Sequence, residues 1–150
     1  MPLTGKPLSG LKVIELGTLI AGPFASRICG EFGAEVIKIE SPDGGDPLRK
    51  WRKLYEGTSL WWFVQARNKK SLTLNLKHPD GLAILKKLLS EADILIENFR
   101  PGVLEKLGLG WDVLHALNPK LVMVRLSGFG QTGPMKDQPG FGAVGESMGG

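Results

Sequence analysis

The sequence predicts an α/β fold in which an open parallel sheet carries helices on both faces. Short apolar runs rich in β-branched residues alternate with stretches of helical period along nearly the whole chain. The first strand–helix–strand unit takes about 30 residues, the size of a right-handed crossover connection between parallel strands. The composition, with 42% hydrophobic and 23% charged residues among 150, is that of a globular protein with a sizeable core.

The first unit comprises a strand over 11–16, a helix over 24–32 and a strand over 35–40. Pro23 suits the first helical position, because its fixed φ matches the helix and the N–H that it lacks would have no partner there. Gly33 suits the left-handed residue that ends such a helix.

The predicted helix carries an apolar stripe formed by Phe24, Ile28 and Phe32. Cys29 lies in the same helix and is the single cysteine, which excludes an intramolecular disulfide and favours a reducing compartment, the cytoplasm. No histidine lies nearby in sequence. We therefore expect Cys29 to be a packed small apolar residue rather than a nucleophile.

The middle of the chain leaves alternatives open. Pro and Gly recur over 41–57, which predicts a loop, either a solvated one or a mobile segment that lays cations and Trp51 over a ligand. The aromatic run 60–64 predicts core packing or a subunit contact. The basic cluster 67–70 is either exposed surface or a phosphate contact at the edge of a strand.

The second half repeats the alternation. Period-two alternation predicts a strand over 71–76, and leucines at helical period predict a helix from 79 to about 91. The remaining predicted elements are a strand over 93–97, helices over 103–107 and 111–117, a strand over 121–126, a Gly-rich loop over 127–134 and a helix over 141–150.

Several function classes are disfavoured. The turn 17–23, GTLIAGP, lacks the GxGxxG spacing of a dinucleotide site, although Glu40 ends the second strand as a ribose-binding acid would. The loop 127–134 has no following GK[ST] and is not a P-loop. The net charge of +4 comes from dispersed cations, which favours a phosphorylated small molecule over nucleic acid. Neither a signal peptide nor a membrane-spanning apolar run is visible.

Ligands of open parallel sheets bind beyond the carboxyl ends of the strands. Because parallel strands present these ends at one edge, we predict a site there for an elongated anionic ligand, with Lys77, Arg100 and Lys106 as its cations. The predicted strand ends are 18–21, Ser41, Lys77, 98–100 and 127–129.

Six motifs then follow one another along the chain: PLSGLKVIEL, LIAGPFAS, GEFGAEVIKIESPDGGDPLR, RNKKSLTLNLKHPDG, ADILIENFRPGVLEKLGLG and LSGFGQTGP. In this order the set resembles the class III CoA-transferases, the family of formyl-CoA transferase and carnitine CoA-transferase. The resemblance implies that 1–150 is the N-terminal part of a large Rossmann-like CoA-binding domain. The remainder of that domain and a smaller second domain are absent from this chain.

The resemblance further implies an enzyme, an acyl-CoA:carboxylate CoA-transferase that works as an interlocked homodimer. It would move CoA from an acyl-CoA donor, for which we expect succinyl-CoA, to a small carboxylic acid through anhydrides with a catalytic Asp. CoA is then the substrate and carrier, and no metal, redox cofactor, nucleic acid or membrane is implied as a partner.

Carried onto this sequence, the resemblance implies contacts to CoA from several segments. The implied residues are Leu19, Ile20 and Ala21 in the first turn, Leu74, Asn75, Leu76 and Lys77 along the adenine, and Asn98, Phe99, Arg100, Lys106 and Leu107 from the pantetheine to the nucleotide. Lys106 stands where the family often has Arg, which keeps the charge but loses a bidentate fork. Ser41 stands where some relatives have Arg near the nucleotide.

The sequence also departs from the family pattern. The catalytic Asp is expected beyond Gly150, so the chain alone should be inactive. Related acyl-CoA racemases have a His-Asp pair where Phe141 and Gly142 stand, and some formyl-CoA-type members have Gln and Glu where Ile20 and Gly142 stand. These differences disfavour, without excluding, an α-methylacyl-CoA racemase, and they disfavour oxalate as the acceptor. A non-catalytic CoA-binding domain is the third alternative.

Overall fold

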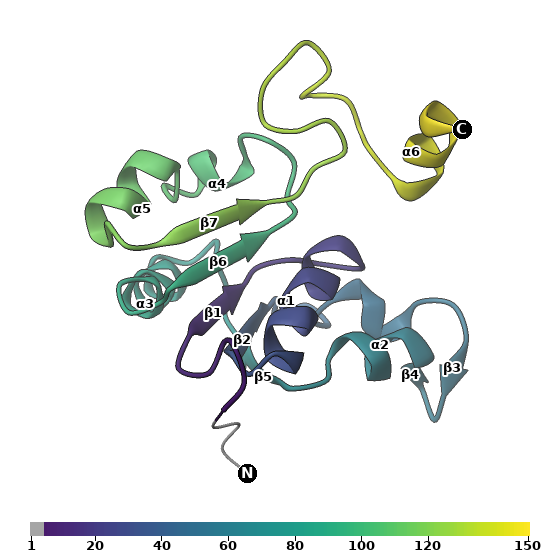
Figure 1. Ribbon diagram of the computed structural model, residues 1–150, viewed down its shortest axis with the longest axis horizontal. Helices are drawn as coiled ribbons and strands as arrows, with labels where there is room; N and C mark the ends of the chain where they lie inside the picture. The colour runs from purple at the N-terminus through teal and green to yellow at the C-terminus, as the bar shows by residue number, and fades with distance from the viewer. Residues whose placement is uncertain (1–4) are drawn as a thin grey trace.

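The computed structural model of the protein describes residues 5–150 and has the predicted α/β architecture (Figure 1). In chain order the elements are β1 (Lys12–Glu15), α1 (Ala21–Glu31), β2 (Glu35–Glu40), the 3₁₀ helix η1 (Pro47–Lys50), β3 (Leu54–Tyr55), β4 (Thr58–Ser59), α2 (Leu60–Gln65), β5 (Lys69–Thr73), α3 (Pro79–Leu89), β6 (Ile94–Glu97), α4 (Val103–Lys106), α5 (Trp111–Leu117), β7 (Val122–Arg125) and α6 (Gly142–Gly149).

The main sheet has five strands in the order β5-β2-β1-β6-β7, and every neighbouring pair is parallel. The strand order reverses at β1, which lies between β2 and β6. Ligand sites of doubly wound sheets lie at such a switch point, outside the carboxyl ends of the strands. The fold class predicted from the sequence is therefore confirmed, and the fold indicates one edge of the sheet as the place for a site.

Helices cover both faces of the sheet, and the core is divided accordingly (Figure 1). On one face, α3, α4 and α5 contribute buried leucines such as Leu85, Leu104 and Leu114, which pack on Ile14 and Leu95 of the strands. On the other face, α1 packs on β1, β2 and β6. Apolar side chains on both faces are what a parallel sheet with crossover helices requires.

Helix α1 differs from the sequence prediction in two ways. It begins at Ala21, so Pro23 is the third helical residue rather than the first. The apolar stripe does not face the sheet, because Phe24 is 44% and Phe32 50% exposed. Small residues form the buried face instead, namely Gly22, Pro23, Ser26 and Gly30. They let the helix approach a stretch of sheet that carries charged side chains.

The segment 41–57 is more ordered than the predicted loop. It contains η1, whose Leu48 is fully buried, and the first strand of the β3–β4 hairpin. The aromatic run forms α2, but Trp61 and Phe63 are exposed rather than part of the core. The following strand was predicted over 71–76 and in fact spans β5, Lys69–Thr73, so the basic residues begin the strand.

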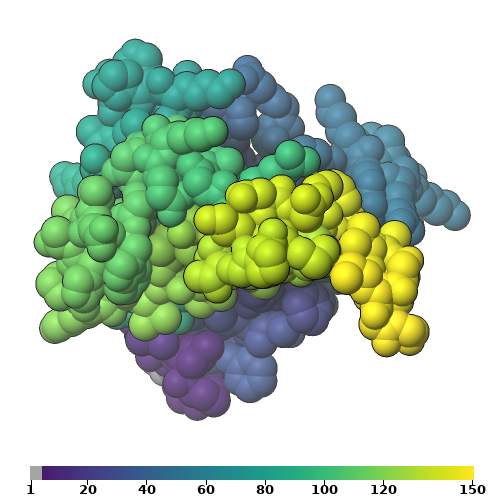
Figure 2. Space-filling model, turned by 90° about the horizontal axis from the view of Figure 1, so that it is seen from above, coloured from purple at the N-terminus to yellow at the C-terminus, as the bar shows by residue number. Residues whose placement is uncertain are grey.

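The carboxyl ends of the strands share one edge of the sheet, as predicted. Figure 2 shows the molecule from above, with the segment after β7 across the centre of the view and α6 (yellow) at one side. Helix α6 has no buried residue among those described. Across residues 5–150, none of the helices combines the length and apolar character needed to cross a bilayer.

Candidate functional site

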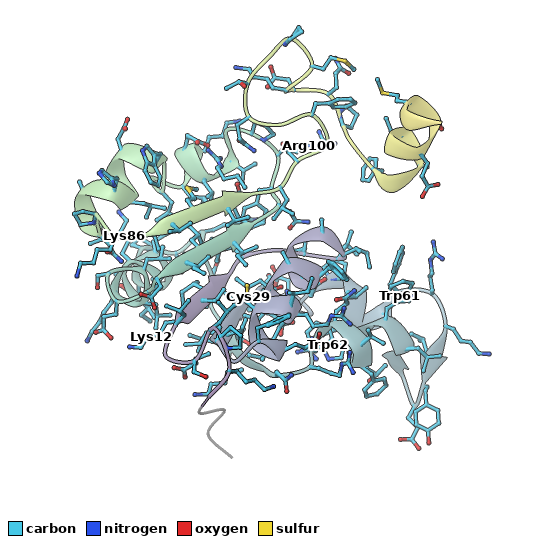
Figure 3. All side chains as sticks on the ribbon, in the orientation of Figure 1. Lys12, Cys29, Trp61, Trp62, Lys86 and Arg100 are labelled. Atoms are coloured by element: carbon cyan, nitrogen blue, oxygen red, sulfur yellow. The ribbon has the colours of Figure 1, made fainter. Side chains whose placement is uncertain are left out.

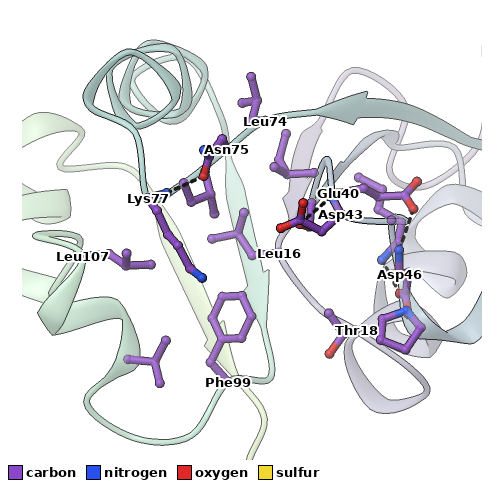
Figure 4. Close-up of a pocket in the computed structure, with 17 residues that line it drawn as sticks. Leu16, Thr18, Glu40, Asp43, Asp46, Leu74, Asn75, Lys77, Phe99 and Leu107 are labelled. Atoms are coloured by element: carbon purple, nitrogen blue, oxygen red, sulfur yellow. Dashed lines mark hydrogen bonds and ion pairs between the residues drawn. The ribbon is translucent and has the colours of Figure 1, made fainter.

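Two adjoining cavities open at the carboxyl edge of the sheet. The first has a volume of about 500 Å³ and lies between the ends of β1, β2 and β5 and helix α4 (Figure 4). Its lining is mainly apolar, with Leu16, Leu74 and Phe99 among its walls. The Lys77 side chain extends into it towards the Phe99 ring. Lys38 also lines this cavity, but it is paired with Glu15 and Asp46. A largely apolar wall with the Lys77 ammonium suits a flat base that carries a phosphate.

The second cavity has a volume of about 750 Å³ and shares Thr18 and Phe99 with the first. It is lined by the turn before α1, by the end of β6, by Trp51 and Arg52, and by residues of the C-terminal segment from Gln138 to Glu146. Arg100 lies above the upper edge of the sheet, near the segment that follows β7 (Figure 3). Arg52 stacks on Trp51, with its guanidinium carbon 4.5 Å from the ring centroid.

The structure brings together nearly all the residues that the resemblance implies as CoA contacts. Six line the first cavity: Leu74, Asn75, Leu76, Lys77, Phe99 and Leu107. The second cavity holds Leu19, Ile20, Ala21, Asn98 and Arg100, with Phe99 again. Lys106 lines neither cavity, although it neighbours Leu107 and is exposed at the end of α4. Three separate stretches of sequence therefore converge on one surface.

The turn after β1 is fixed by polar side chains. Asn98 Oδ1 accepts the Thr18 N–H at 2.7 Å, and Asn98 Nδ2 donates to the Thr18 carbonyl at 2.9 Å. The Lys38 ammonium donates to the Gly17 carbonyl at 2.7 Å. The Leu19 N–H donates to Asp46 Oδ1 at 3.0 Å. Hydrogen bonds thus hold three consecutive residues of a loop that borders both cavities.

A buried ionic cluster lies beneath this turn, under α1. Glu15 and Lys38 are 2.8 Å apart, Lys38 and Asp46 are 2.8 Å apart, and Lys69 is 2.8 Å from Glu15. Burial lowers the pKa of Lys69, and the nearby Glu15 opposes this shift. Ser26 of α1 donates to Glu15 at 2.6 Å. Two acids and two cations balance each other, as buried charges must.

This cluster corrects the prediction for Lys69 in the basic run 67–70, whereas Arg67 and Lys70 are exposed, as the surface interpretation expects. Lys69 is buried beneath α1 and paired with Glu15, so it is neither exposed surface nor a phosphate contact. Lys70 pairs with Glu35 on β2. The sequence alone did not indicate that Glu15 and Lys38, which sit inside apolar strands, would need partners from a loop and from β5.

Hydrogen bonds within the protein also occupy the Glu40 carboxylate. Burial alone raises the pKa of this carboxyl, but hydrogen bonds from Arg49, Ser71 and the Asp46 amide outweigh it and lower the pKa from 4.5 to about 2. Both Arg49 hydrogen bonds to Glu40 are 2.7 Å long. A carboxylate engaged in this way is not free to bind a ribose, so the structure gives no support to a dinucleotide site.

Cys29 is half-buried between α1 and the sheet and packs against the apolar cluster of that face (Figure 3). Burial raises the pKa of its thiol, with the nearby Lys69 opposing the shift. A thiol with a raised pKa holds little thiolate at neutral pH and is a poor nucleophile. The interpretation of Cys29 as a packed apolar residue is therefore supported.

Comparison with known proteins identifies the family. The sequence profile described as CoA-transferase family III matches residues 8–150. The chain belongs to CoA-transferase family III. A relative in Chloroflexus aurantiacus, succinyl-CoA–D-citramalate CoA-transferase, is 57% identical over 146 residues, which are 97% of this chain and 36% of the relative. The succinyl-CoA:glutarate CoA-transferase of Homo sapiens is 40% identical over 146 residues, covering 97% of this chain and 33% of the relative.

Solved structures of this family have the same fold. A CAIB/BAIF family protein from Brucella suis superposes with a TM-score of 0.90 at 38% identity, over 96% of this chain and 39% of that one. The protein Rv3272 from Mycobacterium tuberculosis gives a TM-score of 0.88 at 37% identity, over 97% of this chain and 40% of that one. The family III chain described here spans about a third of the length of the curated relatives that it matches.

The structure also gathers the positions at which the resemblance implies a departure from some relatives. Ile20, Phe141 and Gly142 come from distant parts of the sequence, yet all three line the second cavity. Glu146 of α6 lines it as well. Thr18 belongs to the predicted strand end 18–21, and Arg52 is one of the cations that one interpretation of the 41–57 segment lays over a ligand. Asp46 was not predicted as a lining residue, because its place depends on how the 41–57 segment folds back onto the sheet.

Proposed function

We propose that the full-length protein is a CoA-transferase that moves CoA from succinyl-CoA to a small carboxylic acid, and that this chain forms the N-terminal part of its large CoA-binding domain. The observation that carries the proposal is the convergence of the implied CoA contacts on two cavities that share Thr18 and Phe99. The family match over 8–150 supplies the reaction class.

CoA would lie across both cavities, with its nucleotide in the first and its acyl end in the second. The apolar walls of the first cavity suit the adenine, and the ammonium of Lys77 has no ion-pair partner among residues 5–150, which leaves it available for a phosphate. Asn98, Phe99 and Arg100 at the end of β6 would guide the pantetheine from one cavity to the other. Lys106 would reach a phosphate from the rim.

The acyl end would meet a cationic pocket. Arg52 and Arg100 both line the second cavity, and Glu146 is the acid among the residues that line it. The relatives reported above are named for succinyl-CoA and for citramalate or glutarate, which carry a carboxylate remote from the one that is activated. A guanidinium is well suited to bind such a carboxylate through a bidentate pair of hydrogen bonds. We therefore infer that the acceptor is a dicarboxylic acid.

The chemistry would be supplied by an Asp beyond Gly150. Its carboxylate would attack the thioester carbonyl, the C–S bond would break, and the CoA thiolate would leave. The thiolate would then attack the aspartyl carbonyl of the anhydride so formed, which releases the donor acid and leaves an aspartyl thioester of CoA. The acceptor carboxylate would attack that thioester, releasing the thiolate and forming an anhydride with the Asp, and the thiolate would attack the acceptor carbonyl of this anhydride to give the product thioester and the free Asp carboxylate. This chain would bind CoA and orient the acyl group through residues 19–21 and 98–100. We further infer an interlocked homodimer in the cytoplasm.

The test is transfer of CoA by the full-length protein from labelled succinyl-CoA to a panel of monocarboxylic and dicarboxylic acids. With the label in the CoA moiety, we expect a labelled thioester to form with dicarboxylic acids whose two carboxylates are separated by a carbon chain, and not with oxalate, whose carboxylates are directly joined. If no acid in the panel accepts CoA, the proposal fails. Size-exclusion chromatography with light scattering then tests the dimer, for which the exposed Trp61 and Phe63 on α2 offer an apolar surface.

Two alternative functions can be distinguished with the same preparation of the full-length protein. An α-methylacyl-CoA racemase would exchange the α-proton of a 2-methylacyl-CoA with deuterated water and would form no new thioester. Phe141 and Gly142 line the cavity where that exchange needs a base, which disfavours this function. A non-catalytic CoA-binding domain would bind CoA without either reaction, and its continuation would lack an Asp after a Gly.

A further inference from the structure

Leu19 has an unusual backbone conformation. Its φ is +61°, in the left-handed region that branched aliphatic residues seldom occupy. It lines the second cavity and stands just before α1. A residue held in such a conformation persists only where the surrounding structure imposes it, and such residues cluster at binding sites. The question is therefore which group holds Leu19 in place.

The group is Asp46. Its Oδ1 accepts the Leu19 N–H at 3.0 Å and the Leu48 N–H at 2.8 Å, while its Oδ2 is 2.8 Å from the Lys38 ammonium. The Asp46 side chain is 1% exposed, so water cannot substitute for these partners. Its own N–H donates to Glu40 Oε2 at 2.9 Å. Oδ1 therefore accepts both hydrogen bonds, whereas Oδ2 accepts none and is held by its ion pair with Lys38.

Asp46 also connects the two cavities. It lines the first, and through one hydrogen bond it sets the backbone of a residue that lines the second. Figure 4 shows Asp46 at the wall of the first cavity, near Thr18. The segment 41–57 therefore contributes more than a surface loop, because it carries the acceptor that fixes the turn after β1.

We propose that Asp46 is a positioning residue for the acyl-CoA site: it holds Leu19 in the left-handed conformation and so presents the 19–21 turn to the ligand. This inference rests on the proposed function. Without the carboxylate, Leu19 relaxes to negative φ, and the backbone of the turn moves away from the path of the ligand. A change of Asp46 therefore lowers the affinity for acyl-CoA through the 19–21 turn rather than at Asp46 itself.

Substitution at position 19 tests the proposal without disturbing the buried charges. In the full-length protein we compare Leu19→Val, a β-branched residue that opposes positive φ, with Leu19→Asn, which accepts it. Isothermal titration with CoA should give an affinity about tenfold weaker for Leu19→Val than for Leu19→Asn, although Val is chemically closer to Leu. An affinity for Leu19→Val equal to or above that for Leu19→Asn would overturn the role of the backbone conformation.

Asp46→Asn completes the test. The NH₂ group of the new amide must replace one of the two carboxylate oxygens. It then faces either the Lys38 ammonium or the N–H groups of Leu19 and Leu48, and in both cases one donor meets another donor. We expect Asp46→Asn to weaken CoA binding about tenfold in the wild-type background and less than threefold in the Leu19→Asn background, where positive φ needs no support. The melting temperature should fall equally in both backgrounds, and Asp112→Asn, which removes an exposed charge on α5, is the control for charge.

The outcomes separate the two proposals. If the wild-type protein does not bind CoA, the proposed function is overturned. If it binds CoA and Asp46→Asn causes the same fold loss in both backgrounds, Asp46 acts otherwise than through Leu19, and the positioning role is overturned. If Asp46→Asn does not fold, the comparison of Leu19→Val with Leu19→Asn decides the matter alone.

Discussion

Asn98 and Thr18 are joined by a pair of hydrogen bonds that ties the end of β6 to the end of β1. Asn98 Oδ1 accepts from the Thr18 N–H at 2.7 Å, and Asn98 Nδ2 donates to the Thr18 carbonyl at 2.9 Å. The pair spans 80 positions of sequence. It lies where the two cavities meet, because Thr18 lines both of them and Asn98 lines the second.

The first prediction concerns this pair. Asn98→Asp keeps the acceptor for the Thr18 N–H but loses the donor to the Thr18 carbonyl, and it adds a negative charge where an anionic ligand is expected. We expect the KM for acyl-CoA to rise at least tenfold, with a loss of stability of about 1 kcal/mol for the missing hydrogen bond. Steady-state kinetics and urea unfolding of the full-length protein measure the two effects.

Asn98→Ser is the matched comparison, because it removes both hydrogen bonds without adding charge. We expect its KM to rise less than that of Asn98→Asp. An equal rise for the two variants would show that the charge does not matter, which contradicts the proposed anionic ligand.

The second prediction concerns the contact of α1 with the turn. A Cβ on Gly22 would lie 2.8 Å from the Gly17 Cα and 3.1 Å from Asn98 Oδ1. Gly22→Ala therefore forces the helix away from the turn, and we expect a loss of about 2 kcal/mol in the free energy of unfolding, as for other overpacked sites. Gly145→Ala on α6, where a Cβ meets no atom within 4 Å, is the control and should not destabilise.

The third prediction is a pH dependence. The pKa of Glu40 is lowered from 4.5 to about 2 in the folded protein. Its ionised form is therefore stabilised by folding, and this contribution is fully present above pH 4.5 and is lost as the pH falls towards 2. Glu40→Gln should lower the free energy of unfolding at pH 7 by about 2 kcal/mol and should flatten its pH dependence in that range.

Urea unfolding at a series of pH values measures this difference. Glu91→Gln is the control, because Glu91 takes part in an exposed ion pair with Lys12, and such pairs contribute little. If wild type and Glu40→Gln lose stability in parallel between pH 4.5 and 2, the ion pair of Glu40 with Arg49 is not the cause.

The fourth prediction concerns Lys106, which is exposed at the end of α4, beside Leu107 of the first cavity. If Lys106 meets the 3′-phosphate of CoA, Lys106→Ala should weaken the binding of CoA more than that of dephospho-CoA. Isothermal titration of both ligands tests this, with Lys87→Ala on the exposed side of α3 as control. Equal losses for the two ligands would place Lys106 away from that phosphate.

Much of the fold could be predicted because its signals are local. The β-branched runs of β1 and β2 and the leucine period of α3 are each contained in a few neighbouring residues. The predicted strand ends gather at one edge for a reason that is general to parallel sheets. The predictions were wrong where tertiary packing outweighed a local sequence pattern. The stripe of Phe24 and Phe32 predicts a buried face, but the charges beneath α1 favour the small residues on the opposite side.

By itself the sequence determined the succession of the five sheet strands and of most helices along the chain, the family, and most of the stretches that line the two cavities, but not η1 or the β3–β4 hairpin. Only the tertiary structure decided how the charges are paired. Lys69 pairs with Glu15 from a distant part of the sequence, and Asp46 reaches Lys38 from the loop that follows β2. Each buried charge must find a partner, because a buried charge without one is too costly. That pairing draws the 41–57 segment against the turn after β1, and so gives Leu19 a conformation that no local pattern indicates.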